Sequence, residues 1–110
     1  MKRKSNKQRR FDEELSGMRE AVYERAEGRC EVATPMICAS TGLMHIHHRR
    51  SRRIRKDGKA NSLSNLLLVC QPCHALIHHD RPWAKTHGFI VSSNSDPDRV
   101  PMSTTNRWMH

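Results

Sequence analysis

Residues 65–79 of the chain have the sequence NLLLVCQPCHALIHH. The apolar run in the first part of this segment predicts a buried strand over residues 65–70. Pro72 is compatible with the first turn of a helix, so residues 72–79 are predicted to form a short helix that begins just after a cysteine turn. This junction places two cysteines and three histidines close together in the fold.

The segments around this junction predict a strand, loop, strand, helix order. Residues 43–48 are expected to form a short strand, and residues 49–64 are polar and basic, which indicates a long exposed hairpin connection. The dipeptide Asp57-Gly58 is a good turn signal within it. After Pro82 we expect a further helical turn and a short strand at residues 89–92.

An amphipathic helix is predicted over residues 16–27. Gly28 stands where a C-terminal cap belongs, and Asp12 and Ser16 are alternative N-caps. The apolar stripe has helical spacing and consists of Leu15, Met18, Val22 and Ala26.

The 110 residues suffice for one domain, predicted over residues 15–93, between a disordered basic arm (1–14) and a loose tail (94–110). Only 35% of the residues are hydrophobic, so little apolar surface is available to offset chain entropy. A structural metal would compensate for this, because it contributes about 10–16 kcal/mol in small zinc modules.

Positive charge is concentrated in two segments. The formal net charge is +9, and 13 of the 20 Lys and Arg residues lie in residues 2–10 and 49–59. This pattern predicts a nucleic acid partner, although a basic terminal segment can also serve only solubility. The apolar runs are too short to span a membrane and no secretory pattern follows the basic start, so an intracellular protein is expected.

Four cysteines predict a structural zinc site. Cys70 and Cys73 form a C-x-x-C pair, and Cys30 with Cys38 supplies a second, more widely spaced pair. Four thiolates close a tetrahedral zinc site and leave no open position for catalysis. The alternatives are a disulfide, a redox C-x-x-C, or replacement of one cysteine by a nearby histidine such as His74.

Six of the eight histidines flank the basic loop. His74 and His78 share a helix face, and His45 and His47 share one side of the preceding strand, with His48 on the other. Two clusters on a hairpin can supply two metal ligands and one free base. The alternative is that a histidine is an incidental surface group. We prefer this alternative for four of the eight histidines taken singly: His45, His79, His87 and His110.

These motifs carry a family resemblance. His47-His48-Arg49, then Leu63-Ser64-Asn65-Leu66, then Cys70-x-x-Cys73-His74 with His78, closely resemble the signature of HNH endonucleases in its cysteine-bracketed form. Arg29-Cys30 upstream and residues 87–91 (HGFIV) downstream resemble the small HNH proteins of bacteriophages. The resemblance spans residues 18–92.

The resemblance implies an α+β protein with a ββα-metal fold, clamped by the four-cysteine zinc and preceded by a helix. It assigns the general base to His48 and the ligands of a catalytic divalent metal to His47 and His74. Asn65 would brace the hairpin loop and so orient the base. His78 would contact the scissile phosphate or complete the metal coordination.

Two departures from the family affect the site. His47 stands where many members have aspartate, so the site is expected to accept Zn²⁺, Ni²⁺ or Co²⁺ beside Mg²⁺ and Mn²⁺. The loop has a single Gly58 where relatives have paired glycines. Its arginines are expected to contact DNA phosphates, a set formed by Arg49, Arg50, Arg52 and Arg53.

The sequence therefore predicts a metal-dependent DNA endonuclease that hydrolyses phosphodiester bonds and takes no small-molecule substrate. By analogy with phage relatives, it would act in genome processing or packaging beside a terminase, in the cytoplasm of a bacterial host cell. The alternative is a non-catalytic, zinc-stabilised DNA-binding module, which explains the cysteines and the charge but not the order of His48, Asn65 and His74.

Overall fold

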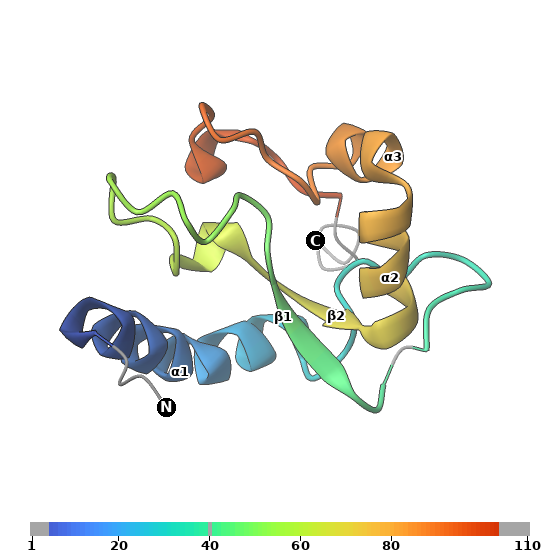
Figure 1. Ribbon diagram of the computed structural model, residues 1–110. Helices are drawn as coiled ribbons and strands as arrows, with labels where there is room; N and C mark the ends of the chain where they lie inside the picture. The colour runs from blue at the N-terminus through green and yellow to red at the C-terminus, as the bar shows by residue number, and fades with distance from the viewer. Residues whose placement is uncertain (1–4, 40, 104–110) are drawn as a thin grey trace.

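A two-stranded antiparallel sheet lies between helices in the computed structural model, which describes residues 5–39 and 41–103 (Figure 1). Strand β1 (Met44–His48) pairs with β2 (Leu66–Cys70), with His47 opposite Leu67 and His48 opposite Leu66. A short 3-10 helix, η1 (Leu63–Asn65), precedes β2, and α2 (Gln71–His79) follows it without an intervening residue. The predicted strand, loop, strand, helix order is confirmed, with strand and helix ends within one residue of those expected.

Strand β2 forms the centre of the core because both of its faces are buried. All five of its residues are inaccessible to solvent. On one face Leu67 and Val69 pack with Ile77 of α2, and on the other face Leu66 and Leu68 pack against α1. This burial on both faces explains why the strand is an unbroken apolar run rather than an alternating one.

Helix α1 (Asn6–Ala26) begins ten residues before the predicted start at Ser16. Ser5 caps its first turn, with its side chain accepting a hydrogen bond from the Gln8 amide at 3.1 Å. The early turns are held by tertiary contacts, because Phe11 is buried and its carbonyl accepts a hydrogen bond from Asn61 of the loop at 3.0 Å. The expected disordered arm (1–14) is therefore helical from Asn6 onward, while residues 1–4 lie outside the described part.

The C-terminal end of α1 is tied to the free edge of β2. Glu31, only 1% exposed, exchanges hydrogen bonds with the backbone of Leu68 through its own amide (2.8 Å) and its carboxylate (3.0 Å). Arg25 pairs with the same carboxylate at 2.6 Å and donates to the carbonyls of Leu63 and Leu66. The ion pair, in which the Glu31 carboxylate is buried, also forms hydrogen bonds with backbone groups. It thus covers an edge of β2 that would otherwise be open to strand pairing.

The chain after α2 also differs from the prediction. Helix α3 (Arg81–Thr86) follows at once, as the expected further helical turn, but residues 89–92 form no strand, and Val91 makes a single backbone bond to Arg49 at 2.9 Å. The predicted loose tail packs on the domain in its described part, through the 3-10 helix η2 (Pro97–Arg99) and the buried Pro97. Among the described residues no helix is long and apolar enough to span a membrane.

Asn65 joins both ends of the long loop between the strands. Its side-chain oxygen accepts from the Arg50 amide (2.8 Å), and its side-chain nitrogen donates to the carbonyls of Arg50 (3.1 Å) and Ala60 (2.9 Å). The residue is completely buried. Its amide therefore replaces backbone pairing in a segment that has no strand partner.

We expect Asn65→Ala to lower the free energy of unfolding by about 2–4 kcal/mol, because it leaves buried backbone groups without partners. Asn94→Ala is the matched control, since Asn94 is exposed, and it should change stability by less than about 0.5 kcal/mol. Denaturant unfolding of the metal-loaded proteins measures both. Equal stability of the Asn65 variant and the parent would contradict the bracing role.

Candidate metal centres and catalytic cleft

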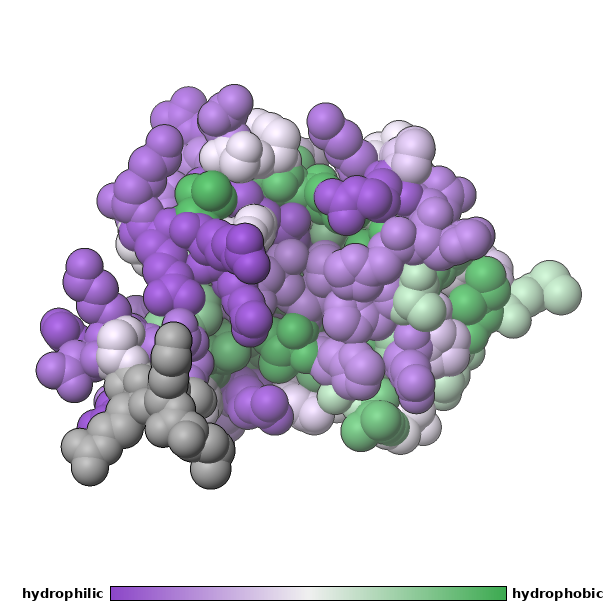
Figure 2. All heavy atoms as spheres, viewed as in Figure 1, coloured by the Kyte–Doolittle hydropathy of each residue, from purple (hydrophilic) through white to green (hydrophobic). Residues whose placement is uncertain are grey.

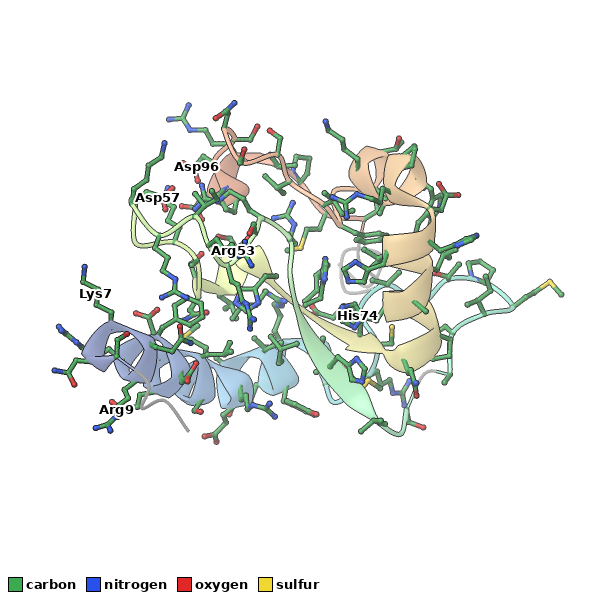
Figure 3. The ribbon with its side chains drawn as sticks, in the orientation of Figure 1. Lys7, Arg9, Arg53, Asp57, His74 and Asp96 are labelled. Carbon is green, nitrogen blue, oxygen red and sulfur yellow. The ribbon has the colours of Figure 1, made fainter. Side chains whose placement is uncertain are left out.

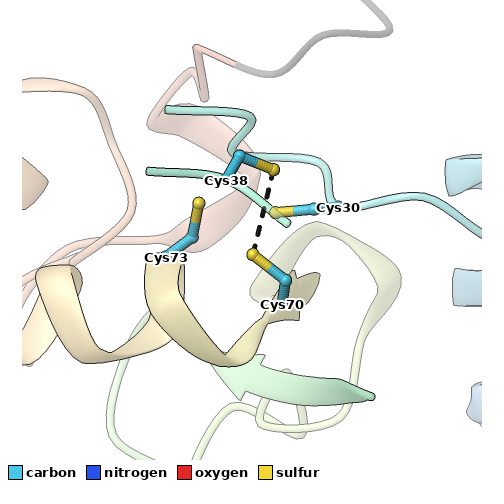
Figure 4. Close-up of side chains that lie close together, drawn as sticks. All are labelled: Cys30, Cys38, Cys70 and Cys73. Atoms are coloured by element: carbon cyan, nitrogen blue, oxygen red, sulfur yellow. Dashed lines mark hydrogen bonds between the residues drawn. The ribbon is translucent and has the colours of Figure 1, made fainter. Parts of the chain in front are cut away.

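Four cysteine thiols from distant segments converge beside the sheet (Figure 4). Cys30 follows α1, Cys38 belongs to the next loop, Cys70 ends β2, and Cys73 lies in the first turn of α2. Their sulfur atoms all lie within 4.8 Å of one another, and none of the four is bonded in a disulfide. The structure therefore places no disulfide here.

The thiol cluster has the dimensions of a tetrahedral metal site. The Cys38 and Cys70 sulfurs are 3.8 Å apart, and a tetrahedron with Zn–S bonds of about 2.3 Å has edges of about 3.8 Å. Burial by itself raises the pKa of the Cys70 thiol, but hydrogen bonds from the amides of Cys73 and Ala39 outweigh it and lower this pKa to about 7. The Cys70 thiolate is thus accessible near neutral pH, whereas burial raises the pKa of the Cys73 thiol to about 11, so a bound metal ion would have to displace the Cys73 proton.

Three imidazoles form a second cluster on the other side of α2's first turn. The ligand atoms of His47, His74 and His78 lie within 4.8 Å of one another, with the Nε2 atoms of His74 and His78 only 3.1 Å apart. Figure 3 shows His74 projecting from α2 toward β1. The sequence paired His47 with His74 and left His78 between two roles; the structure brings all three together.

Neighbouring groups hold these rings as a metal site would require. His47 Nε2 donates to the Phe89 carbonyl at 2.8 Å, which leaves Nδ1 as its unprotonated ligand atom. His74 Nδ1 lies 2.9 Å from His45 Nδ1, so His45 contacts the cluster and is not an incidental surface group. Burial lowers the pKa of His47 to about 4, so this ring is neutral and able to bind metal at any pH well above that value.

His48 ends β1, and its Nε2 faces Asn61 of the loop rather than the three imidazoles. Its Nε2 lies 2.9 Å from the side-chain oxygen of Asn61, while the Asn61 nitrogen donates to the Phe11 carbonyl at 3.0 Å. The second bond fixes the orientation of the amide, so His48 Nε2 must be the protonated nitrogen and Nδ1 the basic one. Among the described residues Nδ1 has no hydrogen-bond partner.

Asn61 is a contact that the sequence did not predict, because nothing in a short polar loop marks one asparagine as the partner of a histidine. The Phe11 ring also stacks near His48, with centroids 6.0 Å apart and an angle of 21° between the rings. Burial, together with the nearby charges of Arg52 and Arg55, lowers the pKa of His48, which keeps it neutral at physiological pH.

A cleft of about 820 Å³ brings His48 together with the imidazole cluster. His47, His48 and His78 line it on one side, and the exposed Arg81 and Lys85 of α3 line it on another. The sequence analysis missed these two cations, although their spacing of four residues on a helix beside the histidines was an available signal.

The structure corrects the prediction that Arg49 and Arg50 contact DNA phosphates, since both are only 2% exposed. Arg49 donates to four carbonyls, those of Ser64 (2.7 Å), Gly88 (2.6 Å), Pro97 (3.1 Å) and Val100 (2.5 Å). Arg50 forms a bidentate ion pair with Asp57 at 2.8 Å, and Figure 3 labels Asp57. The two guanidinium groups hold the loop against the C-terminal segment, whereas Arg52 and Arg53 are exposed.

These features define a small α+β protein whose thiol cluster has the dimensions of a metal site and whose imidazoles form a second cluster nearby. Residues 36–81, less than half of the chain, match the family model described as HNH endonuclease, so this segment is similar to that family. The match covers the sheet, the loop and α2, and it confirms the resemblance seen in the sequence. Comparison with curated proteins and with solved structures found no match.

We expect the thiol cluster to hold one zinc ion per chain, found by elemental analysis of purified protein. Cys73→Ser should lose this zinc and unfold, because the folding energy of such a site, about 10–16 kcal/mol, is as large as the stability of a small domain. Met36→Ser alters an exposed side chain of the loop that carries Cys38. This variant should keep both the zinc and the melting temperature of the parent. A Cys73 variant that melts like the parent would refute a structural metal at this position.

Proposed function

We propose that the chain is a metal-dependent DNA endonuclease in which β1, β2 and α2 form a ββα-metal unit. The observation that carries the proposal is the cleft in which His48 lies beside the cluster of His47, His74 and His78. Phosphodiester hydrolysis needs a group that accepts a proton from water and positive charge that stabilises the transition state. His48 would be the proton acceptor, and the imidazole cluster could hold a metal ion that supplies the positive charge.

His47, His74 and His78 would hold one divalent metal ion, which would act as a Lewis acid on the phosphate oxygens. Neutral imidazoles suit Zn²⁺, Ni²⁺ and Co²⁺ better than a carboxylate site does, beside Mg²⁺ and Mn²⁺. The neutral state of His47 and the hydrogen bonds at His47 and His74 support this role. With His78 as a ligand, its alternative role as a direct phosphate contact is not needed.

His48 is the proposed general base. Its Nε2–H is engaged by Asn61, so Nδ1 would accept the proton of the attacking water, a contribution of about 10²–10⁴-fold in rate. Asn61 and Asn65 would have separate functions: Asn61 contacts the base itself, and Asn65 holds the loop that carries Asn61.

Exposed cations around the cleft would bind the DNA backbone. Arg81 and Lys85 line the cleft and are placed to contact phosphates that flank the scissile bond. Arg52 and Arg53 keep their proposed role in affinity because they are exposed. Such contacts position the duplex without reading its sequence.

A non-catalytic DNA-binding module would share the thiol cluster and the cations. It would not require a free imidazole nitrogen next to three clustered imidazoles, and we therefore place it second. Action beside a phage terminase, in the cytoplasm of a bacterial host, rests on the family resemblance alone.

We expect His48→Ala to reduce plasmid cleavage by about 10²–10⁴-fold while the catalytic metal remains bound, because the metal ligands are untouched. His74→Ala should lose both cleavage and that metal, measured by calorimetric titration. His79→Ala is the matched control, an exposed histidine of the same helix, and should cut like the parent. Undiminished cutting by highly purified His48→Ala would eliminate the proposed base, and absence of cutting by the parent with every metal would favour the binding module.

Asn61→Leu should lower kcat about tenfold or more with little change in KM, because His48 would lose the partner that fixes its tautomer. The imidazole ¹⁵N shifts report the tautomer directly: the parent should show a protonated Nε2, and the variant a mixture. Asn61→Asp keeps an oxygen acceptor and should keep the Nε2–H form. A parent His48 that carries its proton on Nδ1 would contradict the assignment.

A further inference from the structure

A second groove, of about 350 Å³, runs between the N-terminal part of α1 and the loop. Its positive charge comes from both sides, with Lys7 and Arg10 on the helix and Arg55 on the loop, against the single carboxylate of Glu14. Lys7, Arg10 and Arg55 are all exposed. The groove is therefore a cationic hollow built from segments that are more than 40 residues apart in the sequence.

The two walls of this groove are joined by contacts of the described residues. The Arg55 guanidinium lies 3.8 Å from the centre of the Phe11 ring, and it also contacts Gln8 of α1 at 3.4 Å. The same guanidinium donates from Nε to the Arg52 carbonyl at 3.0 Å. A cation stacked on an aromatic ring is held in place by these contacts, while its Nη1 group stays available to an anion. These contacts thus fix the Arg55 guanidinium in place without neutralising its positive charge.

The groove adjoins the catalytic cleft. Phe11 lines the groove and stacks near His48, and His48 lines the cleft. The exposed Arg52 and Arg53 belong to the same loop. Figure 2 shows mostly hydrophilic side chains over the loop, so a polyanion that leaves the cleft past His48 meets a hydrophilic surface there rather than an apolar one.

We propose that this groove binds the phosphate backbone of duplex DNA a few nucleotides away from the bond in the cleft. The inference rests on the proposed endonuclease function and extends it, because it assigns α1 a part in holding the substrate. Phosphate fits the groove because Lys and Arg donors converge on it from two walls. The nucleic acid would then be held on both sides of His48, by α3 in the cleft and by α1 in the groove.

The test compares two double variants that remove the same charge from α1. Lys7→Gln with Arg10→Gln removes the two groove cations of α1, and Arg9→Gln with Arg19→Gln removes two exposed cations that do not line the groove. Figure 3 shows Lys7 and Arg9 leaving α1 on opposite sides, with Lys7 on the side of the loop. All proteins carry His48→Ala, so that bound DNA is not cut.

The probe is a DNA duplex of roughly 20 base pairs, which at about 3.4 Å per base pair exceeds the 42 Å length of the molecule. The Kd is measured over a range of salt concentrations. Each lost phosphate contact reduces the slope of log K against log salt by about 0.9. The groove variant should therefore flatten the slope by about two units and weaken binding, and the control variant should change both much less.

Equal effects of the two double variants would overturn the groove site, since they would show that the charge of α1 acts only diffusely. An unchanged slope in the groove variant would overturn it as well, and would leave the proposed endonuclease intact if the His48→Ala parent binds the duplex and the protein with His48 cuts it. A parent that binds no duplex DNA at low salt would contradict the endonuclease together with the groove. Preference for an RNA duplex of the same length would replace DNA as the partner.

Discussion

Strand β2 continues into α2 without a loop, and this junction orients the thiols of Cys70 and Cys73 and the imidazoles of His74 and His78. The strand is buried on both faces, so its register against β1 cannot slip without exposing leucines. The helix therefore starts at a fixed place, directly after Cys70. Its first turn directs Cys73 into the thiol cluster and the next residue, His74, into the imidazole cluster.

Two clusters whose donor atoms could hold a metal share one helical turn, so metal binding there would couple stability to the proposed chemistry. A metal held by the thiols would fix the start of α2 and with it the positions of His74 and His78, one turn apart. Loss of that metal would disturb the imidazoles even though it touches none of them. The small core makes this coupling necessary, because the apolar contacts of five strand residues and a few helix residues supply limited stability by themselves.

His48, the proposed base, is positioned by a different part of the chain. His48 depends on Asn61 from the loop and on Phe11 from α1, and the loop depends on Asn65, Arg49 and Arg50 for its shape. Arg49 is the extreme case, since its guanidinium binds four carbonyls while burial lowers its pKa to about 10, still high enough to keep it charged. The arginines nearest to the histidine pair thus stabilise the fold, and the exposed cations farther away are the ones that remain for DNA.

The sequence by itself determined the features that depend on local order. A run of apolar residues predicted β2, a C-x-x-C pair predicted two members of the thiol cluster, and a spacing of four put His74 and His78 on one face of α2, because strand and helix periodicity follow from neighbouring residues alone. Only the tertiary structure decided that Arg49 and Arg50 are buried, that Asn61 holds His48, that α1 begins at Asn6, and that Arg81 and Lys85 line the cleft. Each of these depends on partners distant in the chain, and whether an arginine meets a carbonyl or water is set by how the segments pack, which no local pattern encodes.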